Sequence, residues 1–213
     1  MSRFRAHDVS MVLRDGMPVF PGNPPFRREA TRAIRRGDAA NESLLTFGSH
    51  CGTHVDAPLH FIEGGAAIDA IPIERFLGPA RLFDLTAVDR IDRPDLERLD
   101  WNGVTRALFK TRNSEHWERG GAFDHDFVAL APAAADFLVE RKLLLVGVDG
   151  LSVERAQDGA HPVHVALLRA GIVVIEGLRL ARVVAGDYLL FCGVLNLADA
   201  DGAPARVVLV ERE

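Results

Sequence analysis

Apolar and polar residues alternate along several short segments of the chain, a pattern that favours β-strands. One segment, residues 143–148, is apolar throughout, which is typical of a strand that is buried on both faces. The strands predicted in this way cover residues 10–20, with a turn at Asp15-Gly16, and residues 79–86, 104–110, 143–148, 172–175, 188–197 and 206–210. The residues Pro21-Gly22-Asn23-Pro24-Pro25 exclude a helix and predict an irregular loop.

Residues 31–35 and 42–49 are predicted to pair as a hairpin that turns at Gly37-Asp38. Helices are predicted from spacing or composition at residues 71–76, 92–99, 132–141 and 164–170. Asp92 caps the second of these and Pro94 fits its first turn, and Gly171 ends the last one. Strands in hairpins and strands after helices together predict a mixed α/β fold. Because no linker or internal repeat divides the chain, residues 1–213 are expected to form one domain.

Composition and charge narrow the possible partners. The chain has 213 residues, of which 48% are hydrophobic and 26% charged, as in ordinary globular proteins. Its 25 basic and 30 acidic residues give a net charge of −5 without a basic patch, so no nucleic-acid partner is expected. The apolar stretches are far shorter than the roughly 18 residues of a membrane span, so no membrane partner is expected either. The chain has only two cysteines, Cys51 and Cys192, and its first residues show no signal-peptide pattern. Both observations predict a reducing, cytoplasmic setting.

Three of the eight histidines lie between residues 50 and 60, together with one aspartate. If this segment is extended, His50, His54 and Asp56 share one face, and Gly52 leaves a space between them. A helix is disfavoured by the glycine, the β-branched residues and the proline of the segment. Since imidazoles and a carboxylate crowded together would repel or desolvate one another without a cation, the segment predicts a metal site.

Imidazole and carboxylate ligands suit zinc, manganese and iron, and three protein ligands leave a coordination position open for chemistry. A metal-bound water loses a proton near neutral pH and supplies a nucleophile. His60, beyond the bend at Pro58, is then expected to move protons. Cys51 points to the opposite face and is expected to be a small buried residue. No phosphate-binding glycine motif and no Gly-x-Ser-x-Gly is present, so nucleotide cofactors and a serine nucleophile are not expected.

The segment His50-Cys51-Gly52-Thr53-His54-Val55-Asp56-Ala57-Pro58-Leu59-His60 resembles the His-x-Gly-Thr-His-x-Asp-Ala-Pro-x-His signature of the cyclase-like metal-dependent hydrolases. This family includes bacterial kynurenine formamidases and isatin hydrolases. The resemblance extends to residues 18–22, 110–114, 147–149 and 201–206. It implies a single α/β domain of the swivelling β/β/α type, with a mixed, partly barrel-like sheet, and assembly as a homodimer.

The resemblance also implies two metal ions and the residues that bind them. Zinc is the expected metal, and manganese is the second choice. His50, His54 and Asp56 would hold one ion, and Asp56 would bridge to a second ion held by His164 and Glu176. A short helix, a turn and a strand lie between His164 and Glu176, and such an excursion can return Glu176 to a position beside His164. His161, three residues before His164, is the alternative ligand.

The activity implied is hydrolysis of a non-peptide amide bond by a metal-bound hydroxide, with His60 passing the proton to the leaving nitrogen. The expected substrate is N-formyl-L-kynurenine, as in an arylformamidase of tryptophan degradation. Two alternatives stay open, namely opening of a cyclic amide or lactone such as isatin, and a small-ligand binding module stapled by metal.

Three residues are candidates for substrate binding. Phe20 and Phe61 could stack on an aryl group, and Arg112 could hold a carboxylate. The first loop reads Phe20-Pro21-Gly22-Asn23, where the kynurenine formamidases carry Trp-Pro-Gly-Asp, so the chain lacks an indole donor at this position.

Overall fold

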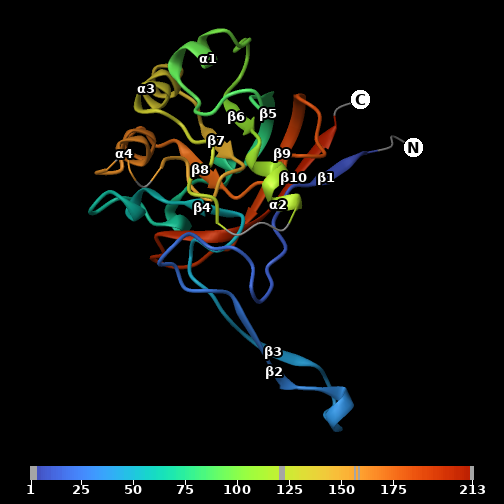
Figure 1. Cartoon of the computed structure of the whole chain (residues 1–213). Helices are drawn as coiled ribbons and strands as arrows, with labels where there is room; N and C mark the ends of the chain where they lie inside the picture. Colours follow the sequence, from blue (N-terminus) through green and yellow to red (C-terminus); the bar gives the residue numbers. More distant parts are fainter. Residues whose placement is uncertain (1–3, 120–122, 156, 158, 212–213) are drawn as a thin grey trace.

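The computed structural model describes residues 4–119, 123–155, 157 and 159–211. Seven strands form a closed, barrel-like sheet, an eighth strand extends it at one edge, and two further strands form a hairpin that projects from the body (Figure 1). The strands are β1 (Ala6–Asp8), β2 (Arg27–Arg32), β3 (Glu42–Thr46), β4 (His54–Asp56), β5 (Leu77–Asp84), β6 (Arg106–Lys110), β7 (Leu145–Val148), β8 (Val173–Glu176), β9 (Gly186–Val194) and β10 (Gly202–Glu211).

The order of the strands in the sheet is β1-β10-β4-β8-β7-β6-β5-β9, and pairing of β9 with β10 closes the barrel. Strands β5, β6, β7 and β8 run parallel to one another, whereas β4, β9 and β10 pair antiparallel with their neighbours. The short strand β4 therefore lies between β10 and β8, although these three strands are far apart in the sequence. This placement brings the histidine-rich segment to the end of β8.

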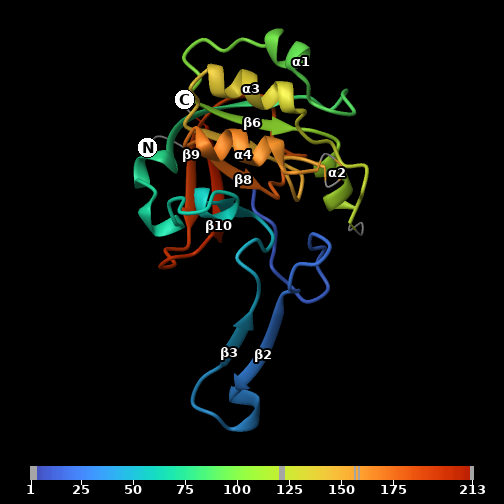
Figure 2. The same cartoon turned by 90° about the vertical axis from the view of Figure 1, so that its left-hand side faces the viewer.

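The sheet is packed on both faces, which explains why its parallel strands are apolar throughout. Leu108, Leu145 and Ile175 point into the barrel interior, and their neighbours Phe109 and Val146 pack on the outer face beneath the helices. The helices are α1 (Arg93–Glu97), α2 (Asn113–Glu118), α3 (Pro132–Glu140) and α4 (Pro162–Arg169). Figure 2 shows α3 and α4 side by side over the strands. Short 3-10 turns occur at Ile34–Arg36, Pro58–His60, Ile68–Ala70 and Ile73–Arg75.

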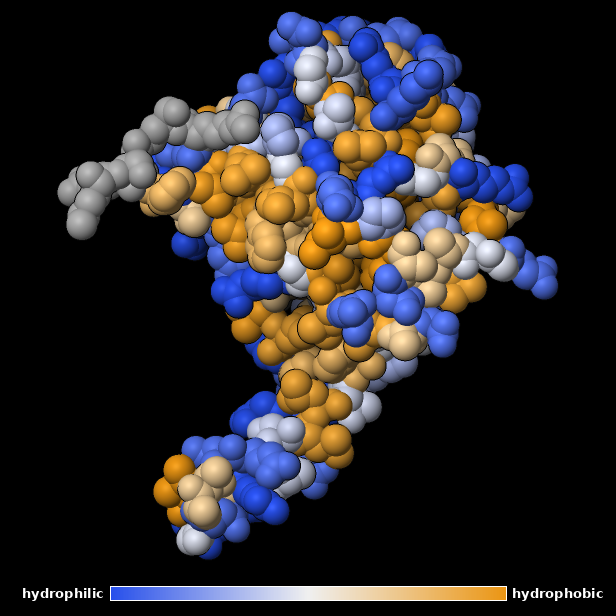
Figure 3. Space-filling model, turned by 180° about the vertical axis from the view of Figure 1, so that it is seen from behind, coloured by the Kyte–Doolittle hydropathy of each residue, from blue (hydrophilic) through white to orange (hydrophobic). Residues whose placement is uncertain are grey.

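The hairpin of β2 and β3, called the arm below, projects away from the barrel (Figures 1 and 2). Every residue of its two strands is exposed except Ala30, which is half-buried. Leu44 and Leu45 on β3 are among the exposed large hydrophobic side chains of the molecule. Seen from behind, hydrophobic residues also cover much of the body above the arm and continue to its base (Figure 3).

The mixed, barrel-like α/β fold confirms the class predicted from the sequence. The predicted cap at Asp92 is present, because its side chain accepts a hydrogen bond from the backbone N–H of Arg93. Two element predictions were wrong and a third was misplaced. Residues 10–20 form an irregular segment without a strand, and the segment 71–76 contains only the 3-10 turn Ile73–Arg75. The predicted hairpin is present, but its first strand lies at Arg27–Arg32, and most of the predicted strand 31–35 is replaced by the 3-10 turn Ile34–Arg36. No helix among the described residues is long and apolar enough to cross a membrane.

Candidate active site

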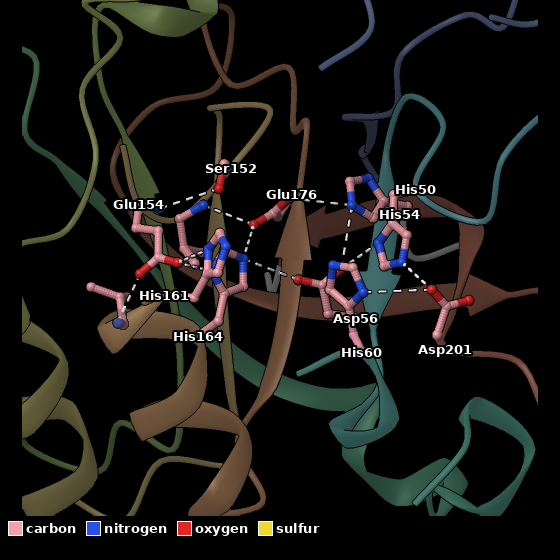
Figure 4. A network of polar contacts seen from close by, with 12 residues as sticks. His50, His54, Asp56, His60, Ser152, Glu154, His161, His164, Glu176 and Asp201 are labelled. Atoms are coloured by element: carbon pink, nitrogen blue, oxygen red, sulfur yellow. Dashed lines mark hydrogen bonds and ion pairs between the residues drawn. The ribbon is translucent and has the colours of Figure 1, made fainter. Parts of the chain in front are cut away.

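The centre of the candidate site is the point where β4 and β8 run side by side. In the register of this pair, His54 stands directly opposite Glu176. Facing residues on neighbouring strands have Cβ atoms only about 5 Å apart, so their side chains meet. Two residues further along β4, Asp56 points to the same side as His54, as the alternation of a strand requires. The side chains of His54, Asp56 and Glu176 are buried. Figure 4 shows them on the neighbouring strands, together with the residues that contact them.

The imidazole of His54 is held in one orientation. Its Nδ1 lies 2.9 Å from the carbonyl oxygen of Gly52, so Nδ1 carries the proton and donates it. The other ring nitrogen, Nε2, then faces two carboxylates, at 3.3 Å from Glu176 Oε2 and 3.4 Å from Asp56 Oδ1. A histidine oriented in this way by a backbone carbonyl is ready to bind a cation through Nε2.

His164 approaches the same carboxylates from the first turn of α4. Its Nε2 lies 3.1 Å from Glu176 Oε1 and 3.5 Å from Asp56 Oδ2. Its Nδ1 lies 2.6 Å from Glu154 Oε1, a buried carboxylate that accepts the Nδ1 proton. The structure therefore places His164 beside Glu176 and Asp56. His161, the alternative ligand, is half-exposed and bonded to Glu154 instead.

His50 and His60 form the opposite side of the site. His50 Nδ1 lies 2.8 Å from Asp56 Oδ1, and its Nε2 lies 2.9 Å from Asp201 Oδ2. The ring of His60 stacks on the ring of His50 with centroids 3.8 Å apart, and its Nδ1 is 3.5 Å from the same oxygen of Asp201. His60 is thus placed against the group of proposed ligands, with its ring held between His50 and the Asp201 carboxylate.

Burial and the surrounding charges shift the titration of these groups in opposite directions. Burial alone would lower the pKa of His54 and His164, but their contacts with buried carboxylates outweigh it and raise both pKa values to about 10. Burial would raise the pKa of Asp56, but the hydrogen bond with His50 and the nearby His54 ring hold it well below its usual range. His60 differs, because burial lowers its pKa below the ordinary value of 6.5. A neutral His60 is able to accept a proton at neutral pH.

Two buried polar atoms indicate that the group fits a metal ion. His54 Nε2 and Asp56 Oδ2 have no hydrogen-bond partner among the described residues. An unpaired buried polar atom is costly, so each such atom needs an explanation. The triad His54, Asp56 and Glu176 has its ligand atoms within 4.8 Å of one another, as does the triad His50, Asp56 and His60. Nitrogen and oxygen donors at this spacing suit a divalent cation of the zinc or manganese type.

Small residues and one threonine allow the segments to approach this closely. A Cβ on Gly177, which follows Glu176, would lie 2.5 Å from the carbonyl oxygen of Gly52. Thr53 Oγ1 donates a hydrogen bond of 2.6 Å to the carbonyl oxygen of Gly177 and ties the two segments together. The sequence-based role of Gly52 was wrong. Its φ of +65° makes a turn, and a Cβ there would meet Leu13 at 2.5 Å, so it leaves no space for a metal.

A cavity of about 200 Å³ opens onto the proposed ligands. Its lining combines the metal-site side chains with aromatic, apolar and amide groups from loops: Phe20, Asn23, His50, His54, His60, Phe61, Leu151, Ser152, Glu154, His161, His164 and Glu176. Phe61 packs against three imidazoles, with ring centroids 4.2 Å from His60, 4.5 Å from His161 and 4.4 Å from His164. Two of the three residues predicted to bind substrate, Phe20 and Phe61, therefore line the cavity.

The structure does not bring Arg112 to this cavity. Its guanidinium contacts Asp89 at 2.6 Å and the carbonyl oxygens of Val88 and Asp126 at 3.2 and 3.1 Å. The motif around Arg112 has a structural explanation. Buried Asp149, at the end of β7, accepts hydrogen bonds from the backbone N–H and side chain of both Thr111 and Ser114. These bonds fix the start of the loop that carries residues 150–154 to the cavity.

Sequence reasoning gave no role to Asp201, Glu154 or Asn23, nor to Leu151 and Ser152 of the cavity lining. Asp201 was noted only as part of the closing motif, yet it contacts both His50 and His60. Glu154 orients His164, and Asn23 lines the cavity. The sequence did contain a signal for Glu154. This residue lies six positions after the end of a buried strand, in a loop of the kind that often carries site residues.

Cyclase-family proteins are the relatives of this chain. Residues 7–155 match the family described as "Putative cyclase", and the chain belongs to this family. It is 35% identical to the kynurenine formamidase of Bacillus mycoides (strain KBAB4) over 95% of both chains. It is 34% identical to the kynurenine formamidase of Geobacillus thermodenitrificans (strain NG80-2), again over 95% of both chains.

Solved structures agree with this assignment. A predicted metal-dependent hydrolase from Bacillus stearothermophilus is 40% identical and superposes with a TM-score of 0.84, covering 99% of this chain and 100% of that chain. Isatin hydrolase A from Labrenzia aggregata, bound to benzyl benzoate, shares the fold with a TM-score of 0.86 at 23% identity, over 99% and 94% of the chains. The protein is a hydrolase of the cyclase family.

Proposed function

We propose that this hydrolase cleaves a non-peptide amide bond in an N-formylated arylamine, with N-formyl-L-kynurenine as its substrate in tryptophan degradation. The observation that carries the proposal is the convergence of His50, His54, Asp56, His164 and Glu176 beneath a small cavity with aromatic walls. The relatives named kynurenine formamidase support the choice of substrate. Residues 1–213 would act as one cyclase-like metal-hydrolase domain. The cytoplasmic location expected from the sequence also stays a prediction.

The five converging residues would hold two Zn²⁺ ions, with Mn²⁺ as the second choice. His50, His54 and Asp56 are proposed for one ion, and Asp56, His164 and Glu176 for the other. Divalent cations at this place would polarise the substrate carbonyl and lower the pKa of a water molecule. The two fixed imidazoles support this assignment, because each presents Nε2 to the shared carboxylates while Nδ1 is bonded elsewhere.

His60 is proposed as the residue that moves the proton. Its lowered pKa favours the neutral ring, and its Nδ1 faces the Asp201 carboxylate at 3.5 Å, so Nε2 would be the proton acceptor. His60 would accept a proton from the attacking water and deliver it to the leaving nitrogen. Phe20 and Phe61 would contact the aryl ring of the substrate.

One observation favours the second candidate, opening of a cyclic amide or lactone such as isatin. The described residues that line the cavity include no Lys or Arg that could hold a carboxylate, and isatin, unlike N-formyl-L-kynurenine, carries no carboxylate. In the third alternative, the metal would only stabilise a module that binds a small ligand. The similar proteins are named as hydrolases and give this alternative no support.

A substrate panel tests these proposals. The metal-loaded protein should release formate from N-formyl-L-kynurenine and leave isatin intact. His60→Ala should reduce kcat by roughly 100- to 10,000-fold without loss of metal, because a positioned proton-transfer group contributes about this much. His7→Ala, on β1 at the edge of the sheet, serves as the control histidine. Isatin opening without formate release would favour the second candidate, and an unchanged kcat would remove His60 from proton transfer.

The homodimer implied by the resemblance is also a proposal, and the arm supports it. A two-stranded hairpin is only marginally stable alone in water, so this exposed arm needs a partner surface. The arm, residues 27–46, carries five arginines and three acidic residues, whereas the whole chain has a net charge of −5. An arm that is basic on an acidic protein is complementary in charge to a second copy.

Solution light scattering tests the dimer. Leu44→Asp combined with Leu45→Asp should convert a dimer to a monomer, since these neighbouring residues point to opposite sides of β3 and the substitutions place a charge on each exposed side. Ile73→Asp changes a residue outside the arm that is even more exposed than Leu44 and Leu45, and it should leave the dimer intact. A monomeric wild-type protein, or a dimer that tolerates the double substitution, would contradict the proposal.

A further inference from the structure

His161 is the one histidine at the cavity that the proposed metal site and the proton transfer leave without a role. It lines the cavity with its side chain half-exposed, and its ring lies 4.5 Å from the ring of Phe61. The ring centroids of His161 and His164 are 6.1 Å apart, so His161 lies next to one of the proposed metal ligands. Figure 4 shows both rings beside Glu154.

The backbone at His161 is held in an unusual conformation. Its φ and ψ are 51° and 50°, in the left-handed region, although the residue before a proline normally adopts an extended conformation. Side chains other than glycine occupy this region at a cost and do so mostly where the surroundings enforce it. Here the enforcing contact is with Glu154, which bonds His161, His164 and the backbone N–H of Val163. The strained backbone and this contact together hold the imidazole against the cavity.

The contact with Glu154 also fixes which ring nitrogen of His161 carries the proton. An ionised carboxylate only accepts hydrogen bonds, and Glu154 Oε1 lies 2.8 Å from His161 Nδ1. Nδ1 of the neutral ring is therefore the donor, and Nε2 is an acceptor. No residue that the structure describes is hydrogen-bonded to this Nε2. The half-exposed ring accordingly offers a fixed hydrogen-bond acceptor at the cavity wall.

The charges around the cavity indicate which kind of hydrogen-bond donor would bind to His161 Nε2. Lys and Arg are absent from its described lining, whereas Glu154 lies directly behind His161. Asn23 adds an amide group to the same lining. An acceptor backed by a negative charge favours a donor that is itself positively charged, such as a protonated amine.

We propose that His161, held by Glu154, is a substrate-binding residue that accepts a hydrogen bond from an ammonium group beyond the aryl ring. The inference rests on the proposed function, because the amine of N-formylkynurenine is such a group. It makes His161 a determinant of specificity for amine-bearing aryl substrates and assigns it no part in metal binding or proton transfer.

Binding calorimetry on the metal-loaded protein tests the subsite without requiring turnover. The probes are L-kynurenine and its analogue with hydrogen in place of the α-amine. His161→Leu should weaken binding of L-kynurenine by about 10-fold or more, the usual loss for a hydrogen bond to a charged group, and change binding of the analogue less than about 2-fold. His161→Gln keeps an acceptor oxygen and should retain most of the affinity for L-kynurenine. His7→Leu is the matched control outside the cavity.

Turnover separates this inference from the proposed function. With N-formyl-L-kynurenine, His161→Leu should raise KM and leave kcat and metal content nearly unchanged. Equal weakening of both probes, no weakening of either, or a wild-type protein that binds the two probes equally would overturn the subsite. If formate release persists in that case, the proposed function stands. If the wild-type protein prefers L-kynurenine through His161 but releases no formate, the subsite stands and the proposed function fails.

Discussion

The two ends of the cavity are built in different ways. At the deep end, His54, Asp56 and Glu176 stand on paired strands and are almost completely buried. At the outer wall, Phe20 and His161 stand on irregular segments outside the sheet and reach the cavity from the side. The deep end has fixed geometry because strand register and one hydrogen bond set each side chain. His54 Nδ1 donates to the carbonyl oxygen of Gly52, Asp56 Oδ1 is bonded to His50, and Glu176 Oε1 accepts from the backbone N–H of Val153.

This difference indicates how the work is divided between the two ends. Groups on rigid strands keep the geometry that metal binding needs, whereas loops tolerate change and set which substrate fits. We therefore expect substitutions at the deep end to remove metal and activity, and substitutions at the outer wall to change KM. The following predictions test this division.

The largest effect is expected from Asp56→Asn. The substitution keeps the shape of the side chain but removes the charge that faces His50, His54 and His164. Bound metal should fall below the wild-type stoichiometry, and activity should fall by about 100-fold or more. Metal analysis and turnover measure the two effects. Asp89→Asn, at an exposed surface site, is the control. Unchanged metal content would count against Asp56 as a bridging ligand.

A smaller effect is expected from pH on the metal-free protein. The pKa values of His54 and His164 are about 10 in the fold and near 6.5 when unfolded. Because the folded values are higher, the stabilisation is complete below about pH 6.5 and is lost as pH rises through about 10. The Tm of the metal-free protein should therefore fall between pH 7 and pH 9. A metal ion requires neutral imidazoles, so the metal-loaded protein should show a smaller fall. Equal slopes for both forms would contradict this assignment.

The smallest effect is expected from Arg112→Ala. The guanidinium is bonded to Asp89 and to carbonyl oxygens outside the cavity, so its loss removes surface contacts only. The Tm should fall by no more than about 4 °C, as for a loss of about 1 kcal/mol, and KM should not change. A large increase in KM for a substrate that carries a carboxylate would restore Arg112 as a binding residue.

The sequence predicted the deep end better than the outer wall. The motif from His50 to His60 identifies three imidazoles and a carboxylate, and the structure places all four around one point. The pairing of His54 with Glu176 could not be predicted from local pattern, because it depends on strands separated by more than 100 residues. His164 and Glu176 came from resemblance to the family, and the geometry places them beside Asp56.

Local patterns failed where tertiary contacts decide the conformation. Residues 10–20 alternate as a strand does, but Thr53 and the turn at Gly52 hold part of this segment as a loop instead. Arg112 has the chemistry of a carboxylate-binding residue, yet nearby acceptors hold its side chain outside the cavity. A residue type indicates what a side chain could bind, whereas its position in the fold decides what it contacts.

Removal and return of metal is the most direct test of the central claim that these imidazoles and carboxylates hold a divalent cation. The purified protein is analysed for metal, treated exhaustively with a chelator, and assayed for formate release before and after Zn²⁺ or Mn²⁺ is restored. The account predicts bound metal at the start, loss of activity with its removal, and recovery on its return. Full activity in a preparation shown to contain no metal would contradict it.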